Sequence, residues 1–133
     1  MNTIYAREDD LGADEYIDMV AKSGLNRPIG DRPRIEQMLK QANLILTARQ
    51  DGKLVGFARS LTDFCFCCYL SDLAVDKACQ GQGIGKRLIE MTRTEAGGAN
   101  TTTLLLSAPT AMTYYEGIKM PKADNCFLYR RQQ

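Results

Sequence analysis

Histidine and tryptophan are lacking: the 133 residues contain neither. Without histidine, a Ser-His-Asp triad and a histidine zinc site are excluded, so any proton transfer must fall to carboxylates, Tyr, Lys, Cys or water. Long apolar runs are also lacking, because no stretch approaches the roughly 20 residues that a membrane span needs. The opening residues MNTIYAREDD show neither the basic flank nor the apolar centre of a secretory signal. We therefore expect a soluble, cytoplasmic protein with no membrane partner.

An excess of charge is missing too, since 17 basic and 16 acidic residues leave a net charge of +1. Such a chain has no overall field to recruit DNA or RNA, and we expect no nucleic-acid partner. The five cysteines are an odd number, and three of them, at positions 65, 67 and 68, lie in a strand-like segment. This pattern argues against a complete disulfide framework. We expect reduced, small core residues rather than metal ligands, because adjacent residues on a strand point to opposite faces.

The length permits one domain with a real core and is too short for two ordinary domains, which predicts a single domain over residues 1–133. Periodicity and turn residues predict the elements in order. They are a strand at 3–6, a helix at about 10–23 ending at Gly24, a helix capped by Asp31, strands at 44–49 and 53–61 joined by an Asp51-Gly52 hairpin, a strand at 64–75, a helix ending at Gly97-Gly98, a strand at 104–106, a helix at about 110–117 and a last strand at 126–129. The unbroken run of three leucines at 104–106 is typical of a strand that is covered on both faces.

The segment from Tyr69 to Ala96 carries the clearest functional signal. An apolar run ends at Val75, a turn with glycines at 81, 83 and 85 follows, and a helix then begins. Backbone amides at a helix N-terminus have no intrahelical partner, and glycines let an anion approach the main chain, so the turn is a candidate phosphate cradle. Lys86 and Arg87 could add positive charge. The alternative is a turn that only serves the path of the chain.

Two common nucleotide signatures do not fit this turn. A P-loop requires Ser or Thr after its lysine, and Arg87 follows Lys86 here. The dinucleotide pattern G-x-G-x-x-G fails as well, because the three glycines alternate with single residues.

Two motifs resemble those of the GNAT superfamily of N-acetyltransferases. Leu73-Ala74-Val75-Asp76 followed by Gln80-x-x-Gly83-x-Gly85 is similar to its acetyl-CoA signature, and Ala111-x-x-Tyr114-Tyr115-Glu116 is similar to its A-x-x-F-Y-E segment. The order of elements matches as well, so the resemblance covers nearly the whole chain. It implies a mixed α/β (α+β) fold, with a central, mostly antiparallel sheet splayed into a V and helices on both faces. It also implies acetyl-CoA as the donor, CoA as a product and no metal.

The resemblance assigns roles to residues of the motifs. The backbone of Leu73, Ala74 and Val75 would pair with the pantetheine arm, and the pyrophosphate would lie on the turn formed by Gln80, Gly81, Gln82, Gly83, Ile84, Gly85 and Lys86. Tyr115 would donate a proton to the leaving thiolate; the alternative is a core aromatic, the role we expect for Tyr114. Family members often carry Asn where this chain has Ala108, and Gly-Phe where it has Lys119-Met120.

The acceptor amine must lose a proton before it attacks, so some base is required. Asp72 is the first candidate, with Asp63, Glu116 and a chain of water molecules as alternatives. Asp72 could equally be a solvated carboxylate or one that orients a cationic substrate. The predicted walls of the acceptor site are Arg27, Pro28, Ile29, Asp31, Phe64 and Tyr69, although each could be ordinary loop structure.

The sequence thus predicts an N-acetyltransferase that moves acetyl from acetyl-CoA to a primary amine by direct attack in a ternary complex. The acceptor could be a small molecule or a protein amine, and the chain could form a homodimer. Two alternatives remain: a non-catalytic acyl-CoA-binding or sensing module, and a structural or interaction domain whose turn binds nothing.

Overall fold

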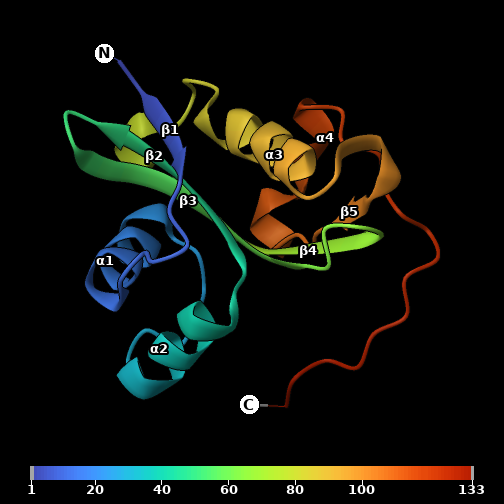
Figure 1. Cartoon of the computed structure of the whole chain (residues 1–133), viewed down its shortest axis with the longest axis horizontal. Helices are drawn as coiled ribbons and strands as arrows, with labels where there is room; N and C mark the ends of the chain where they lie inside the picture. Colours follow the sequence, from blue (N-terminus) through green and yellow to red (C-terminus); the bar gives the residue numbers. More distant parts are fainter. Residues whose placement is uncertain (1, 133) are drawn as a thin grey trace.

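The computed structural model describes residues 2–132 and places one five-stranded sheet between helices (Figure 1). Its strands and α-helices are β1 Ile4–Arg7, α1 Ala13–Ser23, α2 Arg32–Gln41, β2 Leu44–Gln50, β3 Lys53–Thr62, β4 Cys67–Val75, α3 Ile84–Glu95, β5 Thr102–Leu104 and α4 Met112–Gly117. Short 3-10 turns occur at Lys77–Cys79, Gly98–Asn100 and Pro109–Ala111. This content confirms the predicted α+β class.

The sheet has the order β1-β2-β3-β4-β5. Its first four strands are antiparallel neighbours, and β5 alone is parallel to β4. The pairing of β5 covers only the start of β4, from Cys67↔Thr102 to Tyr69↔Leu104. Within residues 2–132, no strand pairs with the rest of that edge of β4. The sheet therefore opens between β4 and β5, which confirms the predicted V.

Local signals in the sequence set the ends of several elements. Gly24 ends α1 with a φ of 79°, in the left-handed region that glycine adopts readily. The side chain of Asp31 caps α2 and accepts a hydrogen bond from the Arg34 amide at 3.2 Å. Asp51 and Gly52 turn the β2–β3 hairpin with φ values of 53° and 78°. The two helix ends and the hairpin are confirmed predictions.

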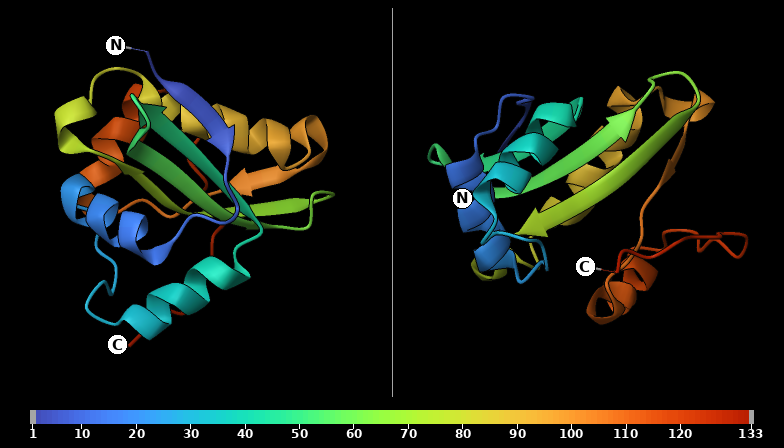
Figure 2. Two further views of the ribbon diagram at one scale, coloured as in Figure 1. Left: turned by 60° about the vertical axis from the view of Figure 1, so that its left-hand side comes forward. Right: turned by 90° about the horizontal axis from the view of Figure 1, so that it is seen from below.

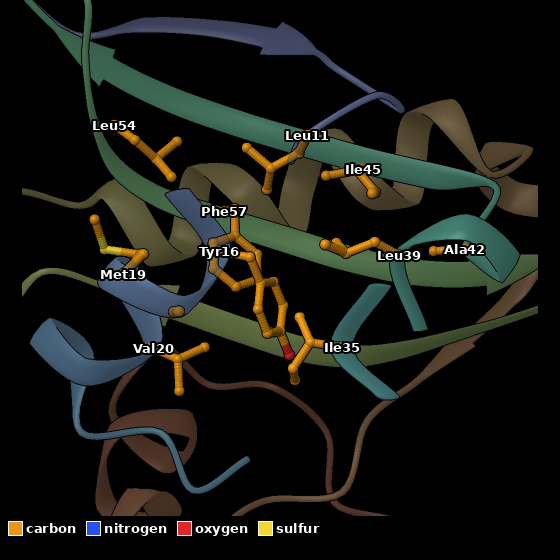
Figure 3. Close-up of a cluster of buried hydrophobic side chains, with 11 residues drawn as sticks. Leu11, Tyr16, Met19, Val20, Ile35, Leu39, Ala42, Ile45, Leu54 and Phe57 are labelled. Atoms are coloured by element: carbon orange, nitrogen blue, oxygen red, sulfur yellow. The ribbon is translucent and has the colours of Figure 1, made fainter. Parts of the chain in front are cut away.

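The helices cover the two faces of the sheet unequally. α1 and α2 lie on one face and α3 lies on the other (Figure 2). Beneath α1 and α2 a cluster of buried side chains includes Tyr16 and Phe57, whose ring centroids are 4.9 Å apart (Figure 3). On the other face Ile84 and Leu88 of α3 pack on the sheet. Each such buried side chain stabilises the fold by about 1.5–3 kcal/mol, so β3 and β4 are held from both sides.

The strand predicted to begin at Phe64 begins instead at Cys67. One carboxylate oxygen of Asp63 accepts hydrogen bonds from the amides of Cys65, Phe66 and Cys67, at 2.8 to 3.0 Å. Such side-chain bonds to nearby amides compete with strand pairing. The chain therefore forms a turn here before β4 starts.

Two predictions for the C-terminal part are wrong. The leucine run is not covered on both faces, because β5 ends at Leu104 and the side chains of Leu104 and Leu106 are 46% and 48% exposed. The last predicted strand, at 126–129, has no regular structure, and Phe127 is 97% exposed. Apolar residues favour a strand only where a neighbouring strand and a covering layer exist, and this tail has no strand partner within the described chain.

The cysteines are also less buried than expected. All five are free thiols, and Cys68 alone is buried, while Cys79 is partly exposed and Cys65, Cys67 and Cys126 are exposed. The prediction that they are core residues is therefore wrong for most of them. Cys67 and Cys68 do lie on opposite faces of β4, and the described residues contain no cluster of three acidic, cysteine or histidine side chains able to hold a metal ion. None of the described helices is both long and apolar enough to cross a bilayer.

Candidate active site

The glycine-rich turn between β4 and α3 leaves backbone amides open at a helix N-terminus. Gly81 and Gly83 have φ values of 85° and 81°, and Gly83 is the N-cap of α3. No side chain caps this helix, and its first backbone bond joins the Arg87 amide to the Gly83 carbonyl at 3.1 Å. The preceding amides, as far as Lys86, have no intrahelical partner. Together with the positive end of the helix dipole, they form a site suited to an anion.

Ile84 holds this turn against the core, and the basic side chains of Lys86 and Arg87 lie beside it. Ile84 is 2% exposed and belongs to the core under α3, which fixes the helix against the sheet. Lys86 and Arg87 are exposed on the first turn of the helix, and the Arg87 guanidinium lies 5.9 Å from the centre of the Tyr5 ring. The positive charge predicted for the cradle therefore lies at its rim.

The side chains of Gln80 and Gln82, the two glutamines in the turn, form hydrogen bonds with residues of β4 and β2. Gln50 at the end of β2 is buried and donates a hydrogen bond to the Gln82 side-chain oxygen at 3.0 Å. Gln80 donates to the Val75 carbonyl at 3.4 Å. Sequence reasoning missed Gln50. Its only signal was that it is a polar residue at the end of an apolar strand. These bonds tie the turn to β2 and β4, so its main chain is held in place.

β4 carries a bulge beside the opening of the sheet. Arg59 pairs with Asp72 and Ser60 pairs with Leu70, which leaves Ser71 without a partner on β3. The bulge therefore lies directly before Asp72. Leu73 beyond it is partly buried against the core under α3. On its other edge this part of β4 has no strand beside it in the described chain, so its backbone is available to a ligand.

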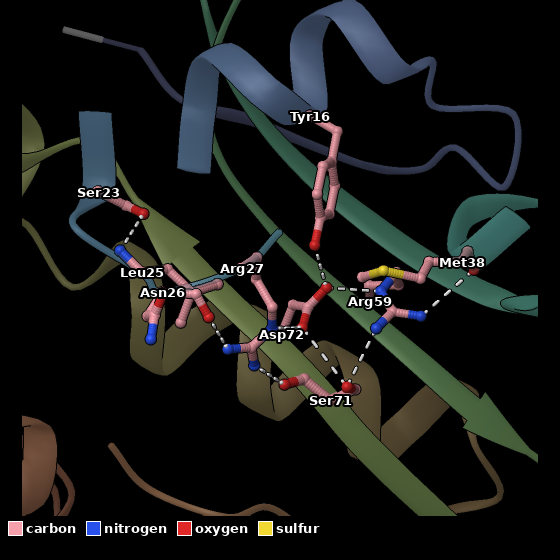
Figure 4. A network of polar contacts seen from close by, with 9 residues as sticks. All are labelled: Tyr16, Ser23, Leu25, Asn26, Arg27, Met38, Arg59, Ser71 and Asp72. Carbon is pink, nitrogen blue, oxygen red and sulfur yellow. Dashed lines mark hydrogen bonds and ion pairs between the residues drawn. The ribbon is translucent and has the colours of Figure 1, made fainter. Parts of the chain in front are cut away.

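Asp72 lies at the centre of a buried polar network (Figure 4). The carboxylate is fully buried, and its Oδ2 accepts hydrogen bonds from the Tyr16 hydroxyl at 2.7 Å and from Nε of Arg59 at 2.5 Å. Its Oδ1 accepts from Nε of Arg27 at 2.6 Å, and the Ser71 hydroxyl lies 3.4 Å away. The donors come from α1, β3, the α1–α2 loop and the bulge itself.

This network sets the charge state of Asp72. Burial raises the pKa of the carboxyl, but the hydrogen bond and charge of Arg59, with the charge of Arg27, outweigh burial and hold the pKa below its ordinary value. Asp72 is therefore ionised at neutral pH and fully hydrogen bonded. Sequence reasoning missed Tyr16 and Arg59. The signal for Arg59 was a charged residue at an inward position of β3, two positions after the core residue Phe57.

Tyr115 lies on α4 and packs against the core under α3. Burial raises the pKa of its phenol, the neighbouring Tyr114 raises it further, and the charge of Arg27 acts in the opposite direction. The two tyrosine rings meet edge to face, with centroids 5.2 Å apart. Tyr114 reaches the start of α3, where a Cβ at position 85 would collide with its hydroxyl. Gly85 is thus required for the contact between α4 and the N-terminus of α3.

The predicted acceptor walls lie in two places. In the loop between α1 and α2, Arg27 reaches the bulge, Ile29 packs against the core and Asp31 caps α2. Tyr69 lies on the β4 surface near the bulge and is 37% exposed. Phe64 is separate from these residues, because it lies in the turn before β4 with Arg7 5.3 Å from its ring centre.

Known proteins share both sequence and fold with this chain. A model of the acetyltransferase (GNAT) domain matches residues 25–118. GCN5-related N-acetyltransferase 2, chloroplastic, of Arabidopsis thaliana is 45% identical over 42 residues, which make up 32% of this chain and 16% of that protein. A GNAT family acetyltransferase structure from Streptococcus pneumoniae superposes with a TM-score of 0.75 at 15% identity, over 99% of this chain and 100% of that one. AAC(6')-Iy, solved with the bisubstrate analogue CoA-S-monomethyl-acetylneamine, gives a TM-score of 0.71 at 13% identity, over 100% of both chains.

The domain match runs from the loop that carries Arg27 to the end of α4. It therefore includes the glycine turn, the bulge and Tyr115. Proteins with this domain use acyl-CoA as the donor of the group that they transfer. The chain belongs to the GNAT family of acetyltransferases.

Proposed function

We propose that this enzyme transfers acetyl from acetyl-CoA to a primary amine by direct attack in a ternary complex. The observation that carries the proposal is the set of open amides at the start of α3. It is supported by the unpaired edge of β4 and by Tyr115 on α4, which packs against the same core as Leu73 and Val75. Acetyl-CoA carries a diphosphate, the extended amide chain of pantetheine and a thioester, in this order. In the proposal these three parts meet the open amides, the edge of β4 and Tyr115.

In this proposal the donor lies along β4 and ends on the turn. The backbone of Leu73, Ala74 and Val75 pairs with the pantetheine arm as a further strand would. The pyrophosphate accepts hydrogen bonds from the amides of residues 81–86, with Lys86 adding charge. The backbone amide at Leu73, next to the bulge, can donate to the oxyanion that forms when the amine attacks the thioester.

Tyr115 serves as the proton donor to the leaving thiolate. Its pKa is raised by burial, so the phenol stays protonated at neutral pH and can donate. A thiol has a pKa of about 8.5 and a free phenol one of about 10, so proton transfer from the phenol to the thiolate is uphill. A phenol held next to the thiolate still speeds the departure of the thiol.

We further propose that Asp72 is not the general base. Its lone pairs already accept hydrogen bonds from Tyr16, Arg59 and Arg27, and its lowered pKa makes it a poor proton acceptor. Asp63 is no better, because its three backbone hydrogen bonds lower its pKa to about 2. We propose that water accepts the proton that the acceptor amine loses. The role of Asp72 is then to hold Arg27 and the bulge in place.

The proposed function is tested by two measurements on the same protein. Acetyl-CoA at about 100 times its dissociation constant should add roughly 2.7 kcal/mol to the stability of the chain. Release of free thiol should then depend on an added amine and should produce the N-acetylated amine. A protein that is stabilised by acetyl-CoA but acetylates no amine would contradict the proposed reaction, and one that acyl-CoA does not stabilise would contradict the donor site.

A further inference from the structure

Arg27 joins the acceptor side of the molecule to the bulge of β4, and it has donors to spare. Three of the five N–H bonds of its guanidinium are engaged: Nε with Asp72 at 2.6 Å, Nη1 with the Asn26 carbonyl at 2.6 Å and Nη2 with the Ser71 carbonyl at 2.7 Å. The other two have no partner among the described residues. The side chain is 25% exposed, so it is partly open to solvent.

The second arginine of the network cannot take this role. Arg59 is 7% exposed, and its three nitrogens donate inward to Asp72, the Met38 carbonyl and the Ser71 hydroxyl. Arg59 therefore supplies charge without reaching a ligand. Arg27 is the more exposed of the two arginines. Figure 4 shows its guanidinium beside Asn26 and Ser71, on the side of Asp72 away from Met38.

The network carries an excess of positive charge. Asp72 is one carboxylate facing two guanidinium groups, while Tyr16 stays neutral because its pKa is raised by burial and by Asp72. The carboxylate has no free position for a substrate ammonium, since a carboxylate offers about four lone-pair sites and the neighbouring donors occupy them.

The surrounding loop leaves this excess in place, because its own positive and negative charges nearly balance. Between Arg27 and the first turn of α2 the chain also carries Arg32 and Arg34 but only one acid, Asp31, whose oxygen caps the helix. Arg32 is paired with Asp14 on α1 and lies 3.8 Å from a carboxylate oxygen of Glu36 on α2. Glu116, next to Tyr115, is the nearest acid in sequence to the proposed proton donor and is exposed to solvent.

We propose that the acceptor is an amine that also bears an anionic group, a carboxylate or a phosphate, and that Arg27 binds this group through its two unengaged N–H donors. A guanidinium fork matches both anions, and a polycationic amine would meet net positive charge and no free carboxylate. This inference rests on the proposed acetyltransferase reaction. It narrows the acceptor to one chemical class.

Pairs of acceptors with and without an anionic group test the proposal. For the carboxylate we compare phenylalanine with phenylalaninamide, for the phosphate O-phosphoethanolamine with ethanolamine, and we use spermidine as the polycation. The amide of an amino acid loses its ammonium proton more easily than the acid does, so intrinsic reactivity favours the amide. We expect kcat/KM to be at least about tenfold higher for the anionic member of one pair, since charged hydrogen bonds of this kind discriminate by at least this factor. The pair that responds identifies the anion.

Arg27→Gln should remove the preference by raising KM for the anionic acceptor about tenfold or more, while its neutral partner is affected far less. Arg34→Gln, which removes one exposed positive charge from the same region, should keep the preference, and Arg27→Lys should restore part of it. Stabilisation by acetyl-CoA is measured for each variant to show that it folds and binds the donor.

Each outcome decides the inference. Faster acetylation of the neutral member in both pairs, or of spermidine over every anionic acceptor, by the unaltered enzyme would overturn the inference and leave the acetyltransferase function standing. An equal loss for charged and neutral acceptors in Arg27→Gln would overturn the role of Arg27. Stabilisation by acetyl-CoA without acetylation of any of these amines would overturn the proposed reaction and the inference together.

Discussion

Arg59 and Asp72 face each other across β3 and β4 as a registered pair, and their side chains form an ion pair of 2.5 Å with both groups almost wholly buried. The pair lies next to the bulge, where β3 and β4 change register. The ion pair and the change of strand register thus occur at neighbouring residues. The bulge beside the opening of the sheet therefore coincides with a buried ion pair between two neighbouring strands.

Removal of Arg59 should destabilise the protein strongly. In Arg59→Met, Asp72 keeps Arg27 but loses its buried partner, and we expect a loss of about 3 kcal/mol in the free energy of unfolding measured with urea. Arg32→Met is the control, because Arg32 pairs with Asp14 at the surface and its loss should leave the urea midpoint nearly unchanged. Similar effects of the two substitutions would contradict the importance of burial.

Acid should unfold the protein through Asp72. Its folded pKa lies below the unfolded value of about 3.9, so below that pH the unfolded chain binds the proton more readily than the folded one. The stabilisation from this ionised group is fully present above pH about 4 and is lost as the pH falls through the folded pKa. Asp72→Asn should therefore be less stable than the native protein at neutral pH and show a flatter decline below pH about 4 in circular dichroism titrations. A parallel decline in both proteins would exclude Asp72 as the source.

The turn should depend on the positive φ of Gly83. There is open space around this residue, so Gly83→Ala tests backbone conformation without a steric clash. The left-handed conformation costs a residue with a Cβ about 1–2 kcal/mol, and we expect this loss of stability together with weaker binding of CoA. Gly30→Ala is the matched control: Gly30 also has open space but no positive φ, and neither stability nor CoA affinity should fall. Calorimetric titration with CoA and thermal melting measure both quantities.

Tyr115 should act in turnover rather than in binding. Tyr115→Phe keeps the ring in the core and removes the phenolic proton, so we expect kcat to fall by about a hundredfold or more while the affinity for CoA stays constant. Tyr114→Phe serves as the comparison, because we assign its ring to packing. If the two variants lost the same activity, Tyr115 would have no special place in proton transfer.

The pH dependence of the rate should follow the acceptor. Because we assign the amine proton to water and not to Asp72, kcat/KM should rise with pH until the acceptor amine itself has lost its proton. A panel of acceptors with different amine pKa values should shift the profile in step. A rise at one fixed pH for all acceptors would indicate a protein base and contradict this assignment.

Much of the fold could be predicted from the sequence because its signals are local. Gly24 and Asp31 mark helix ends through their own backbone and side-chain preferences, and Asp51-Gly52 fixes the hairpin through its positive φ angles. The same holds for the glycine turn, since amides at the start of a helix lack partners wherever the helix lies. The glycine turn and its open amides could therefore be predicted from the sequence, while the assignment of its residues to the cofactor stays a prediction.

The acceptor side was decided by the tertiary structure. Tyr16, Arg27 and Arg59 converge on Asp72 from positions 13 to 56 residues away along the chain. This convergence is the reason why we propose that Asp72 holds the bulge and is not the base. The apolar character of Leu104 predicts a strand covered on both faces, and that of Phe127 predicts a paired strand. Both side chains are instead exposed, because no other segment of the described chain packs over them. The sequence by itself determined where the chain turns, caps a helix and exposes amides, because those properties belong to a few neighbouring residues. Which charges meet, and which apolar residues are covered, depends on contacts between distant segments, and only the packed structure decides them.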